Sequence, residues 1–149
     1  MGSEICLRDR IYAARGGYDL APYPWGGYYL RNSKGKVLAN FKRVGSGNIS
    51  FNRKTKTYEV LVNPTDQTFV NPAPVISYYP NDYGLFNMSG NAAEMLSTTS
   101  SDGKGNRTKG GCFDSGGYDI SIEAEDQFDG WTEPSPFIGF RPIIEVSFK

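Results

Sequence analysis

One stretch of the chain, Tyr79 to Glu94, combines turn-forming residues, aromatic rings and potential oxygen ligands within sixteen positions. Its Asn, Asp and Gly residues favour tight turns, because Asn and Asp bond their own backbone and Gly reaches positive φ freely. Between the turns, Tyr83, Leu85 and Phe86 supply apolar bulk that can pin the loop to a core. A chain with this segment is constrained to fold around an ordered loop.

Oxygen atoms from four positions of this stretch can converge on one hard cation. They are the side chains of Asn87 and Glu94 and the carbonyls of Gly90 and Ala92. Calcium takes about six to eight oxygen ligands from carboxylates, amides, backbone carbonyls and water. The alternative is an ordered surface loop that Asx turns stabilise without a metal. The residues alone leave both interpretations open.

The composition favours a loop-rich domain with β-strands over a helical bundle. The chain has 149 residues, including ten Tyr, nine Phe, 18 Gly and nine Pro, and this length suits one domain with a single core. Sixteen basic residues balance sixteen acidic ones, so charge does not favour nucleic acid or an anionic membrane. No apolar run approaches the ~20 residues of a membrane span. No signal peptide is expected in this chain, because its first residues lead directly into charged sequence.

The residues by themselves point to no catalytic chemistry. The chain contains no histidine, which excludes His-based triads and His metal sites. Cys6 and Cys112 are the only cysteines, and the sequence leaves open whether they pair. No spacing places a Ser or Cys nucleophile beside a Lys or carboxylate base.

Sequence patterns divide the chain into a tail and one domain. Residues 1–10 are expected to be an N-terminal tail or an expression remnant, and residues 11–149 a single domain. Ile11 to Arg15 is typical of the last turn of a helix that ends at Gly16 and Gly17. Alternation on both sides of a basic turn predicts a β-hairpin insertion at about residues 44–68. This hairpin is either a contact surface or a solvated structural element. The later patterns predict a loop over 98–107 and strands over 108–113 and 139–148.

A Pro- and Gly-rich segment, residues 19–29, carries four aromatic residues that could form a shelf for a ligand. Sugars and peptides both stack on aromatic faces. The alternative is a loop that buried rings anchor to the core. The four residues are Tyr23, Trp25, Tyr28 and Tyr29.

Several of these segments together resemble the formylglycine-generating-enzyme (sulfatase-modifying factor) family. The central signature is Pro80 to Glu94. Further matches follow the family's order, at Tyr12–Gly17, Tyr23–Gly27, Ala39–Phe41, Lys109–Gly111 and Ile138–Arg141. The segment from Trp25 to Lys42 is similar in particular to the gliding-motility and type IX secretion lipoproteins of the Bacteroidetes, which have the fold without the oxidase chemistry.

The resemblance implies an α+β, irregular, loop-rich, C-type-lectin-like fold that is truncated or divergent at its N-terminus. It implies a non-catalytic structural or binding module of a bacterial cell envelope, in the periplasm or on the outer-membrane surface, with a protein partner. The copper-binding cysteine positions of the enzymes are Ser115 and Ile120 here, so no copper is expected. Iron is not expected either, because the iron-dependent relatives need a histidine triad, and no zinc site is expected.

The resemblance also bears on calcium. It implies a structural calcium ion at Asn87, Gly90, Ala92 and Glu94, and a second position at Asn40 and Phe41. The second position is weak, because Gln67 stands where the family has an Asp, with Asp66 one residue away.

Three alternatives remain for function. One is a C-type-lectin-like receptor, including the diversity-generating-retroelement type, that binds a protein, a glycan or a small molecule. Another is a residual formylglycine-generating oxidase. The third is a fragment that needs a partner to fold.

Overall fold

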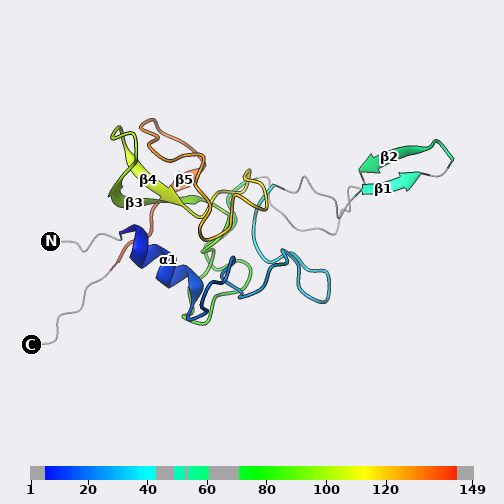
Figure 1. Cartoon of the computed structure of the whole chain (residues 1–149), viewed down its shortest axis with the longest axis horizontal. Helices are drawn as coiled ribbons and strands as arrows, with labels where there is room; N and C mark the ends of the chain where they lie inside the picture. The colour runs from blue at the N-terminus through cyan, green and yellow to red at the C-terminus, as the bar shows by residue number, and fades with distance from the viewer. Residues whose placement is uncertain (1–5, 43–48, 53, 61–70, 144–149) are drawn as a thin grey trace, which may run out of the picture.

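The computed structural model describes residues 6–42, 49–52, 54–60 and 71–143 (Figure 1). Within these residues the elements are the helix α1 (Leu7–Arg15) and the strands β1 (Ile49–Asn52), β2 (Thr57–Val60), β3 (Ala93–Thr99), β4 (Asn106–Lys109) and β5 (Ile138–Gly139). Turns and irregular segments connect them, as the many Gly and Pro residues predict. In this part of the chain, no helix is both long and apolar enough to cross a membrane.

Helix α1 ends where the sequence predicts and begins earlier. Gly16 closes it in the left-handed conformation, with φ of 60°, which glycine adopts without steric cost. Residues 7–10, expected to belong to the tail, form its first turn instead. Arg10 and Ala14 are its buried residues, so contacts with the rest of the fold stabilise this turn more than local periodicity does.

The three-stranded sheet has the order β4-β3-β5 and is mixed. Strand β3 pairs antiparallel with β4, with Glu94 opposite Lys109, and parallel with β5, with Glu94 beside Gly139. Glu94 therefore lies on the central strand.

The sheet shifts three of the predicted boundaries. The loop predicted over 98–107 is shorter, because β3 continues to Thr99 and β4 begins at Asn106. The strand predicted over 108–113 ends at Lys109. Only residues 138–139 of the closing segment are β-strand among the described residues, and 144–149 lie outside them.

The predicted hairpin is confirmed. Strands β1 and β2 pair antiparallel, with Ile49 opposite Val60 and Asn52 opposite Thr57. Residues 44–48, 53 and 61–68 of the predicted insertion lie outside the described residues. The hairpin lies away from the three-stranded sheet in Figure 1.

Small apolar clusters, rather than one large core, hold the described part together. One joins α1 to the loop of residues 79–94, because Ala14 and Met88 pack with Ile122. The other two clusters are Tyr23, Val37, Ala39, Phe41 and Ile120, and Ala93, Cys112 and Phe128. Met88 is only 2% exposed, so the loop contributes a core residue as well as polar groups.

We predict that Gly90→Ala destabilises the fold far more than Gly84→Ala. Both glycines have positive φ, 72° and 76°, so each alanine carries a strain of about 1 kcal/mol. A Cβ on Gly90 would lie 2.2 Å from the Asn40 carbonyl oxygen, whereas nothing lies within 4 Å of one on Gly84. Overpacking of this kind adds about 1–3 kcal/mol. Urea denaturation measures the difference, and equal costs for the two variants would contradict the close approach.

Candidate functional site

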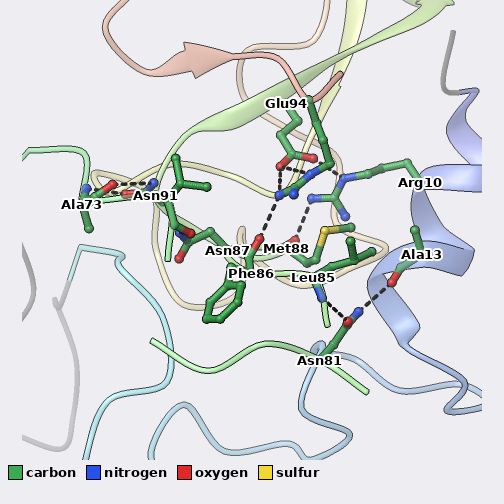
Figure 2. A network of polar contacts seen from close by, with 12 residues as sticks. Arg10, Ala13, Ala73, Asn81, Leu85, Phe86, Asn87, Met88, Asn91 and Glu94 are labelled. Atoms are coloured by element: carbon green, nitrogen blue, oxygen red, sulfur yellow. Dashed lines mark hydrogen bonds and ion pairs between the residues drawn. The ribbon is translucent and has the colours of Figure 1, made fainter. Parts of the chain in front are cut away.

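Asn81 closes the first turn of the loop and attaches it to α1 (Figure 2). Its Oδ1 accepts hydrogen bonds from the backbone N–H groups of Tyr83 at 3.1 Å and Leu85 at 3.0 Å. Its Nδ2 donates to the carbonyls of Ala13 at 2.6 Å and Ala14 at 3.2 Å, which are among the last carbonyls of the helix. The predicted Asx turn is present, and the same side chain also binds the helix terminus.

Asn91 attaches the second half of the loop to two other segments. Its Oδ1 accepts from the Ala73 N–H at 2.6 Å and from Asn40 Nδ2 at 3.2 Å, and its Nδ2 donates to the Ala73 carbonyl at 3.2 Å. Its own N–H donates to the Asn40 carbonyl at 2.7 Å. Asn40 is fully buried, and Phe41 packs in an apolar cluster. The second calcium position remains a prediction, because residues 66 and 67 lie outside the described residues.

Two arginines bind the carboxylate of Glu94, one from each side. Arg10 Nε donates to Oε2 at 2.7 Å. Arg141 donates to Oε1 from Nε at 2.9 Å and from Nη2 at 2.5 Å. The Glu94 side chain is only 10% exposed, and that of Arg10 only 3%. Arg10 comes from α1 and Arg141 from the segment after β5, so this carboxylate joins three parts of the fold.

The same guanidinium groups also bind the loop backbone on both sides of Asn87. Arg10 Nη2 donates to the Met88 carbonyl at 2.7 Å, and Arg141 Nη2 donates to the Phe86 carbonyl at 2.8 Å. Figure 2 shows Arg10 extending from the helix toward Glu94 and the Met88 carbonyl. The loop is therefore held by cations that belong to the chain itself.

Burial lowers the pKa of Arg10, and the charge and hydrogen bond of Glu94 oppose that shift. Arginine nevertheless stays protonated at physiological pH, because its ordinary pKa is far above neutrality. Arg10, Arg141 and Glu94 together carry a formal charge of +1, and the negative charge of Asp126 also acts on Arg10.

Asn87 carries a buried oxygen, Oδ1, that has no hydrogen-bond partner among the described residues. Its Nδ2 donates to the Val75 carbonyl at 2.8 Å, and its backbone is left-handed, with φ of 53°. A cavity of about 240 Å³ opens beside it. The residues that line this cavity are Val75, Asn87, Asn91, Ala92, Glu94, Gly139, Phe140, Arg141 and Pro142.

Three of the four predicted calcium ligands, Asn87, Ala92 and Glu94, therefore line one cavity. Gly90 does not line it, and its N–H donates to the Gly110 carbonyl at 2.7 Å. The unpaired Asn87 Oδ1 is the kind of oxygen that a hard cation takes. Within the cluster of Arg10, Arg141 and Glu94, Glu94 Oε2 accepts one hydrogen bond, from Arg10 Nε. These donors fit a hard cation in kind, while the two guanidinium groups oppose it by charge.

The aromatic residues predicted to form a shelf divide between the interior and the surface. Tyr23 is buried, stacks on Trp25 with a centroid distance of 5.0 Å, and donates from its hydroxyl to the Gly117 carbonyl. Burial is the main cause that raises the pKa of Tyr23. Tyr28 and Tyr29 are each 80% exposed. Only these two and the partly buried Trp25 are accessible to a ligand.

The positions matched to the copper cysteines take part in packing. Ser115 is 1% exposed, and its Oγ accepts the N–H of Cys112 at 2.9 Å. Ile120 is fully buried in the cluster of Tyr23 and Phe41. Cys6 and Cys112 are free thiols in the described part of the chain. Among the described residues, no three His, Cys, Asp or Glu side chains gather closely enough to hold a metal.

Sequence reasoning missed the two arginines of the site. Arg141 was visible only as part of the segment Ile138–Arg141, with no role attached to it. Arg10 carried no signal, because it lies in a stretch without apolar periodicity and a charged residue is ordinarily exposed. Its burial depends on a carboxylate 84 positions away in the chain.

Residues 8–146 match the family described as the sulfatase-modifying factor enzyme 1-like domain. This match covers almost all of the 149 residues, and the chain belongs to this family. Membership implies a C-type-lectin-like fold, which agrees with one short helix and a small mixed sheet among many loops in the described residues. No curated protein matches the chain at a significant level.

We predict that Glu94→Gln costs about 3–5 kcal/mol of unfolding free energy, because it removes the carboxylate that is ion-paired with buried Arg10. Glu123→Gln is the matched control. It removes the same charge from a pair with Arg15 in which the glutamate side chain is 68% exposed, and such pairs contribute below about 1 kcal/mol. Urea denaturation of both variants makes the comparison. Similar costs would contradict the central role of Glu94.

Proposed function

We propose that this protein is a non-catalytic structural or binding module of a bacterial cell envelope. The observation that supports this most concerns the two positions where the family's enzymes carry copper-binding cysteines, because this chain has other residues there. Ser115 and Ile120 occupy them, and both are buried in packing contacts. Copper(I) sites of this kind need paired soft thiolates, and the hydroxyl of Ser115 and the hydrocarbon side chain of Ile120 cannot replace them.

The envelope setting rests on the resemblance of Trp25 to Lys42 to the gliding-motility and type IX secretion lipoproteins. In that setting the partner is a protein, and the module acts in the periplasm or on the outer-membrane surface. The β1–β2 hairpin, which lies away from the three-stranded sheet in Figure 1, is a candidate contact element. Its position supports the proposal, because a hairpin apart from the main body is accessible to a partner.

A ligand-binding receptor is the second candidate. Tyr28 and Tyr29, each 80% exposed beside the partly buried Trp25, favour it. Exposed aromatic faces held in place by a buried stack are suited to a glycan or a peptide. The receptor and the structural module share the same fold and both lack the oxidase chemistry.

Calcium has a structural role in this proposal. The ion would take oxygens of Asn87, Ala92 and Glu94 beside the cavity, with the Gly90 carbonyl the remaining predicted ligand. It would add to the polar contacts that already order the loop.

We predict that the purified protein neither retains stoichiometric copper(I) against a chromophoric chelator nor oxidises a cysteine-containing, sulfatase-type peptide. Hydrazide trapping of an aldehyde product, followed by mass spectrometry, checks the second point. An active enzyme of the family run in parallel is the positive control. One bound copper together with a trapped aldehyde would overturn the non-catalytic assignment.

We predict that calcium at millimolar concentration raises the melting midpoint by a few degrees over chelator, because a ligand at tenfold excess over its Kd contributes about 1.4 kcal/mol. Asn87→Gly should remove this rise. It deletes the unpaired Oδ1 and tolerates the left-handed backbone at this position. The matched control is Asn32→Gly, which removes an exposed-turn amide elsewhere. A rise that survives in Asn87→Gly would place calcium at another site.

A further inference from the structure

We propose that Arg10 is an internal competitor of the divalent cation at Glu94, and that it sets how weakly this loop binds metal. The inference rests on the calcium site proposed above and concerns a residue outside the predicted ligand set. Arg10 lies on α1, and its guanidinium binds Glu94, the only carboxylate among the described residues that line the cavity. The Arg10 guanidinium and a calcium ion at the proposed site would therefore compete for the same Glu94 carboxylate.

The two carboxylate oxygens are divided unequally between the arginines. Arg141 uses two nitrogens on Oε1, whereas Arg10 uses one nitrogen on Oε2. Oε2 is thus the oxygen with the greater remaining capacity to accept. A metal ion at this carboxylate must share Oε2 with the Arg10 guanidinium.

Arg10 also connects the loop to the sheet, as a structural metal ion would. It joins Glu94 on β3 to the Met88 carbonyl in the loop, at 2.7 Å for each bond. Arg141 makes the corresponding connection to the Phe86 carbonyl. The two guanidinium groups flank Asn87, so the loop is tied to the sheet and to α1 before any metal binds.

Charge makes the two cations mutually unfavourable. The cluster carries +1 with both arginines and is neutral without Arg10. A doubly charged ion placed a few ångströms from a buried guanidinium is strongly repelled, because the interior screens charge less than water does. Removing the Arg10 charge should tighten calcium binding by about tenfold or more.

Isothermal titration calorimetry with calcium chloride tests this in wild type, Arg10→Met and Arg8→Met. Arg8 lies on the same helix, is exposed, and its substitution removes the same charge, so it controls for net charge and helix propensity. We expect calcium to bind Arg10→Met about tenfold or more tightly than wild type, with Arg8→Met unchanged. Thermal unfolding should show a wider gap between calcium and chelator for Arg10→Met alone.

Equal calcium affinity in wild type and Arg10→Met overturns the competition while leaving the calcium site in place. Absence of calcium binding in both overturns the competition and the calcium site, whereas the non-catalytic assignment is judged separately by the copper assay. If Arg10→Met folds only when calcium is added, as circular dichroism would show, the competition is supported. If Arg10→Met does not fold at all, Arg10→Gln takes its place, because glutamine keeps an N–H donor for the Met88 carbonyl. Its calcium affinity is then compared with that of wild type in the same way.

Discussion

The buried carboxylate of Glu94 is the interaction on which the described structure depends. It lies on the central strand of the sheet and binds Arg10 from α1 and Arg141 from the segment after β5. A buried carboxylate is stable only when positive and hydrogen-bonding groups surround it. Both guanidinium groups extend beyond it to carbonyls of the loop, so one charged residue brings helix, loop, sheet and C-terminal segment into a single arrangement.

This arrangement explains how a domain with so little regular structure is held together. The apolar clusters are small, and each contains only three to five buried residues. Asparagine side chains connect segments that a larger core would otherwise hold together. Asn81 binds the end of α1, and Asn91 binds residues 40 and 73. Such networks specify one geometry only when their members are satisfied. Within this loop, Asn87 Oδ1 and Ser89 Oγ are buried and have no hydrogen-bond partner among the described residues. Asn87 also lines the cavity where a cation is proposed.

The positions that the family uses for copper and for calcium differ in what this chain places there. At the positions matched to the copper cysteines, Ser115 and Ile120 are buried and take part in packing, and the proposed non-catalytic role is argued from this. At the calcium position, oxygen donors are retained, and two guanidinium groups lie among them. The proposed non-catalytic role rests on the first of these two sites, and the proposed structural calcium ion rests on the second.

By itself the sequence determined the family, the ordered loop, the end of α1 at Gly16 and the β1–β2 hairpin. Each of these depends on local chemistry: Asx turns, a left-handed glycine, and alternation around a polar turn. Only the tertiary structure decided that residues 7–10 are helical, that β3 continues to Thr99, and that Tyr23 is buried while Tyr28 and Tyr29 are exposed. It also decided that Arg10 is buried. The physical reason is that a charge is buried only against a partner, and Glu94 lies 84 positions away, beyond the reach of any local pattern.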